Sequence, residues 1–241
     1  MLRKFLFVSC ALGASLVTTT AFAQGTDDDD HGLKLAPSVE RLAGLSHATL
    51  KPEGDTTGSG TVFSVAGVIH NPLSMPRAAF DVYLPGGFGF GAALGYGSIT
   101  TSETSNGTTR DEGTLRAWLF SPRIEYRVSL GPYFDLIPRL GVTFLGGSET
   151  RADGRSCSGT TLNCTTIPGD TDSVSAIAIS PEAVGVLRLT TSFNLLGGLS
   201  WDQLISASSS HSSGYSGQSS SNDAKGSYSN VHLWFGMGGY L

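Results

Sequence analysis

Histidine and serine are the residues of this chain whose types could perform acid–base or nucleophilic chemistry. His211 precedes Ser212 in a segment rich in serine, and a histidine beside a serine can support deacylation. Because serine is so frequent there, we interpret the adjacency as a result of composition. We interpret His232, beside Trp234, as a hydrogen-bonded interior residue. The other histidines are His31, His47 and His70.

The motifs of common enzyme classes are absent from the sequence. No Gly-x-Ser-x-Gly pentapeptide occurs, so a nucleophile elbow is excluded. Gly87, Gly89 and Gly91 alternate, which is typical of strand glycines facing a crowded interior and not of a dinucleotide-binding loop. The four aspartates 27–30 are typical of a solvated tail. We therefore expect no enzyme activity, no catalytic residue, no metal site and no cofactor.

The first 23 residues have the order of a secretory signal peptide. Arg3 and Lys4 precede an apolar run from Phe5 to Val17, and the small-x-small triplet 21–23 follows. The run has roughly 13 residues, whereas a membrane helix needs about 20. A lipoprotein signal ending at Cys10 is the alternative, but it would leave only a very short apolar region. We predict cleavage after Ala23 and an acidic flexible tail over 24–37.

Charge and hydropathy exclude two further classes. The chain has 15 basic and 20 acidic residues, for a net charge of −5, without a basic patch that could follow nucleic-acid phosphates. No segment after the leader approaches 18 consecutive apolar residues, so a membrane helix is not expected. If the chain crosses a membrane, strands must carry it across.

Alternation of apolar and polar residues with a period of two dominates the rest of the chain. In 115–130 the even positions include Trp118, Phe120 and Ile124, while the odd positions include Arg123 and Glu125. Successive strand residues point to opposite faces, so each such segment predicts a two-faced strand. Residues 61–68 either line the first loop or extend the second strand, and a ten-stranded count stays open. The eight predicted strands are 39–50, 77–85, 87–100, 115–130, 133–146, 174–189, 193–205 and 231–241.

The connections between these strands alternate between short and long. Turns of a few residues lie at 84–87, 130–132 and 190–192, whereas 101–113, 147–172 and 206–229 are long and polar. Short periplasmic turns and long outer loops are the organisation of an outer-membrane barrel.

The two predicted faces differ in chemistry. One face has aromatic residues near the segment ends and a single charge, Arg116, as a lipid-facing surface with an aromatic girdle requires. A soluble sandwich would expose the charged face to water, whereas a closed barrel would hold it in a lumen filled by side chains. In a barrel lumen we expect the charged residues to pair with one another in a structural network, in preference to forming an ion-selective constriction. The girdle residues are Phe88, Trp118, Tyr126, Phe134, Phe193 and Trp201, and the lumen residues are Arg77, Asp81, Arg123, Glu125, Arg127, Asp135, Arg139, Glu182, Arg188 and Asp202.

Two local features complete the pattern. Pro122, Pro138 and Pro181 fall inside strands, where a missing N–H removes a ladder bond, and we interpret them as bulges. Cys157 and Cys164 lie close together in a polar loop, which in an exported protein predicts a disulfide.

Together these features resemble the small bacterial outer-membrane barrels of the OmpA/OmpX and opacity-protein type, over residues 38–241. The resemblance implies a closed, all-β, antiparallel transmembrane barrel in contact with outer-membrane lipid. It also implies insertion by the outer-membrane assembly machinery, which recognises an amphipathic last strand that ends in an aromatic residue. Here that residue is Tyr240, one place before Leu241. We expect a monomer that does not bind nucleic acid. It would act as a non-enzymatic envelope anchor presenting surface loops, and the alternatives are a narrow ion or small-solute channel and a soluble secreted β-protein.

Overall fold

The computed structural model describes residues 33–52, 57–65, 72–105, 108–151, 154–158, 163–167, 170–212, 219–223 and 226–241. The predicted signal peptide and most of the predicted acidic tail lie outside these residues. The described residues are almost entirely antiparallel strands with one short 3-10 helix, η1 (Pro72–Ser74). No helix among them is long and apolar enough to span a membrane.

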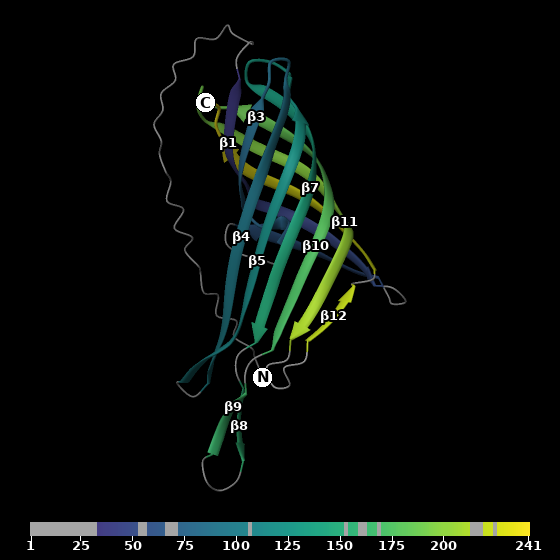
Figure 1. Ribbon diagram of the computed structural model, residues 1–241. Coiled ribbons are helices and arrows are strands. Elements are labelled where there is room, and N and C mark those ends of the chain that lie inside the picture. Colours follow the sequence, from purple (N-terminus) through teal and green to yellow (C-terminus); the bar gives the residue numbers. More distant parts are fainter. Residues whose placement is uncertain are drawn as a thin grey trace.

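Eight strands form a closed ring (Figure 1). Neighbours in sequence pair with each other, the first strand pairs with the last, and β7 pairs with β10 to complete the circuit. The count of eight and the antiparallel order confirm the sequence prediction. The ring consists of β1 (Lys34–Pro52), β3 (Arg77–Tyr83), β4 (Phe88–Ser105), β5 (Thr108–Tyr126), β7 (Phe134–Arg151), β10 (Thr171–Arg188), β11 (Asn194–Ser212) and β13 (Gly226–Gly238).

The strands extend further than the alternation predicts. β1 begins at Lys34, so the barrel starts before residue 38 and includes the end of the expected tail. At the other end, β7, β10 and β11 continue into segments that we expected to be loops. Backbone pairing persists there although the side chains on both faces are polar. Shorter strands outside the ring are β6 (Val128–Ser129), β8 (Gly154–Ser158), β9 (Asn163–Ile167) and β12 (Ser219–Asp223).

The second barrel strand is built from two pieces. β2 (Gly58–Val65) pairs with β1 from Ala43 to Leu50, and β3 pairs with β1 from Lys34 to Glu40. Between the pieces, η1 and Met75 are directed into the barrel, where Leu73 and Met75 are almost fully buried. Residues 61–65 therefore extend the second strand, residues 66–68 lie outside the described residues, and the ring stays at eight.

The three strand prolines are not bulges. The register of β5 with β7 is the same before and after Pro122, and the register of β10 with β11 is the same on both sides of Pro181. Each proline keeps regular pairing on one side: Pro122 with Ala92, Pro181 with Leu140, and Pro138 with Ala183. The missing N–H thus interrupts the ladder on one edge without adding a residue.

Glycines occur where a turn needs a positive φ and where the barrel interior leaves no room for a Cβ. Short turns and the C-terminal end lie at the upper end of the view in Figure 1. Gly87, in the first of these turns, has a φ of 87°, a conformation that favours glycine. Inside the barrel, a Cβ at Gly198 would clash with the ring of Trp234, which is fully buried. The interior is therefore packed by side chains and is not an open pore.

Candidate functional site

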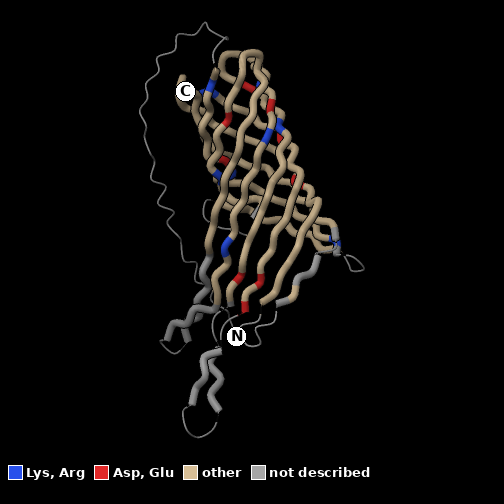
Figure 2. The backbone as a smooth tube through the Cα atoms, viewed as in Figure 1, with Lys and Arg blue, Asp and Glu red and all other residues tan. Residues whose placement is uncertain are grey.

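A network of nine charged residues fills the middle of the barrel. Arg123 donates to Asp81 Oδ2 at 2.6 Å from Nη2 and to Glu40 Oε2 at 2.9 Å from Nη1. Arg139 Nη1 lies 2.6 Å from Glu40 Oε1. Each member is at most 8% exposed, so the ion pairs are shielded from solvent. Figure 2 marks the positions of the acidic and basic residues along the strands. The members of the network are Glu40, Arg41, Arg77, Asp81, Arg123, Glu125, Arg139, Glu182 and Asp202.

Glu40 is the hub of this network, and sequence reasoning missed it. Its carboxylate accepts hydrogen bonds from Arg77, Arg123 and Arg139, which come from three different strands. Its neighbour Arg41, also missed, donates to Glu182 at 2.7 Å and to the carbonyl of Leu73. Arg41 therefore holds the η1 segment inside the barrel.

Backbone geometry brings these two adjacent residues to the same face. Arg41 has a φ of 58°, in the left-handed region, and the pairing of β1 with β13 shifts register between Val39 and Ala43. A bulge of this kind breaks the alternation of faces. The only signal in the sequence is two consecutive charges, Glu40 and Arg41, inside an otherwise alternating strand.

Three of the predicted lumen residues form a separate cluster near the short turns. Asp135 is fully buried and accepts from Arg127 at 3.1 Å and from Arg188 Nε at 2.9 Å. The Arg127 guanidinium carbon also lies 4.8 Å from the centre of the Tyr240 ring. Tyr240 follows the end of β13, and burial raises its pKa to about 12. The ten predicted residues are thus all inside the barrel, but they are divided between two networks.

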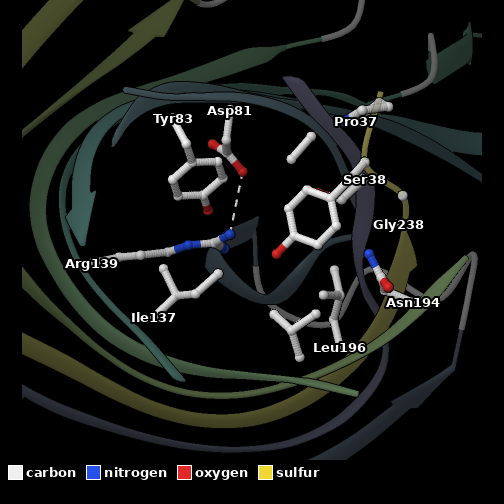
Figure 3. Close-up of a pocket in the computed structure, with 13 residues that line it drawn as sticks. Pro37, Ser38, Asp81, Tyr83, Ile137, Arg139, Asn194, Leu196 and Gly238 are labelled. Carbon is white, nitrogen blue, oxygen red and sulfur yellow. Dashed lines mark hydrogen bonds and ion pairs between the residues drawn. The ribbon is translucent and has the colours of Figure 1, made fainter. Parts of the chain in front are cut away.

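The layers around the central network leave little free volume. On the side of the short turns, Tyr83, Ile137 and Trp234 belong to an apolar cluster. On the other side, Met75 packs with Ala117 and Leu119. Between Asp81, Tyr83, Arg139 and the apolar cluster is a cavity of about 20 Å³ (Figure 3). That volume holds about one water molecule.

Of the histidines that the structure describes, His47 lies 2.8 Å from the Thr61 hydroxyl, and none has both a hydroxyl and a carboxylate within hydrogen-bond distance. His31 and His70 lie outside the described residues. His232 is fully buried, and neither ring nitrogen has a hydrogen-bond partner among the described residues, so our expectation of a hydrogen-bonded histidine is wrong. His211 Nδ1 lies 2.6 Å from Asp172 Oδ1 in an exposed pair near the outer strand ends. In strand register, Ser220 of β12 lies opposite His211.

Cys157 and Cys164 occupy directly opposed positions in the hairpin of β8 and β9. Directly opposed strand positions have a Cα separation of about 4.5–5.5 Å, which is compatible with a disulfide. The bond itself stays a prediction.

The outer face of the ring is apolar. The predicted girdle residues are all exposed, from 40% for Phe134 to 51% for Trp201, and large aliphatic side chains such as Leu94 and Ile124 lie between them at more than 50% exposure. A closed barrel that exposes apolar side chains and buries its charges is suited to a bilayer and not to water. The chain has the fold of a small bacterial outer-membrane β-barrel. The predicted girdle residues lie on this outer face and the predicted lumen charges lie inside the barrel, while the girdle itself stays a prediction.

Comparison with solved structures agrees with this fold. A major outer membrane protein of Thermus thermophilus is similar over 88% of this chain and 100% of that chain, with a TM-score of 0.50 and 14% identity. OprG of Pseudomonas aeruginosa matches over 86% and 95%, with a TM-score of 0.43 and 9% identity. Ail of Yersinia pestis matches over 86% and 98%, with a TM-score of 0.40 and 10% identity. No protein-family profile and no curated protein matches the sequence.

Proposed function

We propose that this barrel is a non-enzymatic, monomeric membrane anchor that presents its outer strand ends and loops at the cell surface. The buried central network carries the proposal. Glu40 and Glu182 bind arginines from several strands and are almost fully buried, so the interior is cross-linked by ion pairs. A sealed, rigid interior supports a role carried out by the exterior.

A channel through the charged interior is the weaker alternative. Conduction needs a continuous path of water, whereas the cavity beside Arg139 has about 20 Å³. Met75 and Leu73 further fill the barrel on the side of the network away from the short turns. Opening a path would require the breaking of several buried ion pairs at once, which is costly because each charge would lose its partner.

Among the described residues, His211 lies beside a carboxylate, Asp172, and His47 lies 2.8 Å from the hydroxyl of Thr61. A catalytic histidine needs a nucleophile or bound water within hydrogen-bond reach as well as an orienting carboxylate. Only the carboxylate contact is present at His211 among the described residues. The lack of a nucleophile contact at His211 supports the non-enzymatic part of the proposal.

Planar-bilayer recording of the purified barrel tests the sealed interior, with a general porin as the positive control. We expect no conductance steps above baseline, and steps of stable size would overturn the anchor with a sealed lumen.

Protease treatment of intact cells tests the surface role, and we expect cleavage within 206–229. Protection of that segment on intact cells, with cleavage after lysis, would contradict surface presentation. The His211→Ala variant should leave lipid composition and proteolysis of the envelope unchanged.

A further inference from the structure

Arg116 is an exception on the lipid-facing side of the barrel. It lies on β5 two residues beyond Trp118, so both side chains are on the outer face, and both are exposed. Two strand residues span about 7 Å. Since Trp118 belongs to the predicted aromatic girdle at the outer end, Arg116 is placed just above the hydrocarbon region, at the depth of the lipid headgroups.

Among the described residues, the neighbours of Arg116 supply hydroxyl groups but no paired carboxylate. In strand register it lies between Ser98 of β4 and Ser148 of β7. The adjacent acid on β7, Glu149, is opposite Leu115, so its side chain starts from the other face of the sheet. Within the described part of the chain, no carboxylate forms an ion pair with Arg116. The arginines at the opposite end differ, because Arg127 and Arg188 both bind Asp135.

A groove on the barrel surface includes Arg116. It has a volume of about 410 Å³ and extends from Tyr96 and Trp118, across β7, to Val174 and Ser175 of β10. Gly146 helps to form it, because a Cβ there would lie 2.5 Å from the Trp118 indole and would displace the ring. Tyr96 is 64% exposed and Trp118 is 50% exposed, so their rings are available to a ligand.

The side chains of this groove indicate which kind of ligand would bind there. A guanidinium forms paired, charge-assisted hydrogen bonds with phosphate oxygens, and basic sites beside membrane strands attract anionic headgroups. The tyrosine and tryptophan rings suit the boundary between headgroups and acyl chains. We propose that Arg116, Tyr96 and Trp118 form a binding site for the phosphate-bearing headgroup of an outer-leaflet lipid.

This site depends on the barrel being in the membrane and not on the sealed interior. The lipid's phosphate would bind Arg116, the hydroxyls of Ser148 and Ser175 would contact its sugar or phosphate oxygens, and its acyl chains would lie along the apolar surface below Trp118. Such a lipid would be retained beside β5 and β7 while other lipids exchange.

Native mass spectrometry of the detergent-solubilised, folded barrel tests the site. The probes are bisphosphorylated lipid A and the same lipid after removal of both phosphates. For the intact lipid we expect Arg116→Gln to bind about tenfold more weakly than the unaltered barrel, which corresponds to the loss of one charge-assisted contact. Lys51→Gln, which removes the same charge from the exposed end of β1, is the matched control and should bind normally.

The dephosphorylated lipid should bind the unaltered barrel about as weakly as the intact lipid binds Arg116→Gln. Equal binding by the two glutamine variants, or equal binding of both lipids, would overturn the proposal. Displacement of the lipid by millimolar inorganic phosphate alone would indicate a free-anion site and would also overturn it. A heat-dependent gel shift verifies that each variant is folded, and Trp118→Ala provides a second variant that should weaken binding of the intact lipid.

Discussion

Replacement of Glu40 by glutamine tests whether the central network determines the stability of the barrel. Glu40 is fully buried and accepts hydrogen bonds of 2.6–2.9 Å from Arg77, Arg123 and Arg139. Glutamine keeps the size and one acceptor oxygen but removes the charge, so three buried guanidinium groups share the remaining carboxylates. Breaking a buried ion pair typically costs about 3–5 kcal/mol. Because Asp81 and Glu182 still bind the same arginines, we expect a loss of about 3 kcal/mol.

Equilibrium unfolding in urea, with the barrel inserted in lipid vesicles, measures this loss. A change of about 3 kcal/mol lowers the folding equilibrium constant by roughly 150-fold. Glu149→Gln is the matched control, since Glu149 is exposed at the outer end of β7 and surface charges contribute little. If Glu40→Gln unfolds at the same urea concentration as Glu149→Gln, the reasoning that Glu40 holds the network together is wrong.

Two further predictions concern packing and covalent structure. Gly198→Ala should destabilise the barrel by about 1–3 kcal/mol in the same unfolding assay, because the added Cβ would overlap the buried Trp234 ring. Gly60→Ala, where no heavy atom lies within 4 Å of the added Cβ, should have little effect, and similar losses in both variants would contradict the packing argument. Cys157 and Cys164 should resist maleimide labelling in unfolded, unreduced protein and react after reduction. Labelling before reduction would rule out the disulfide.

Much of the barrel could be predicted from alternation alone. The parity of apolar residues in segments such as 115–130 assigned Trp118 outward and Arg123 inward, and both assignments agree with their exposure in the structure. The short turns fixed which strands are neighbours, because antiparallel strands joined by a few residues must pair. These signals are local, so a single sequence contains them.

Features that depend on a break in the pattern could not be predicted. Glu40 and Arg41 both face inward because Arg41 adopts a positive φ, which alternation does not reveal. The entry of Met75 into the barrel depends on contacts of its segment with Arg41, a residue more than thirty positions earlier. The effect of Pro122 was misjudged because its regular pairing with Ala92 depends on the partner strand.

The sequence by itself determined the order of the predicted strands, the apolar outer surface and the inward direction of ten charged residues, because a two-residue period acts along each strand separately. It favoured eight strands but left ten open, and the pairing around the ring decided for eight. Only the tertiary structure decided which charges meet. Closure of the ring brings Glu40 of β1 to arginines of β3, β5 and β7, and it divides Arg127, Asp135 and Arg188 from that network. The distances that join these residues across the lumen are set by the register and closure of all eight strands together.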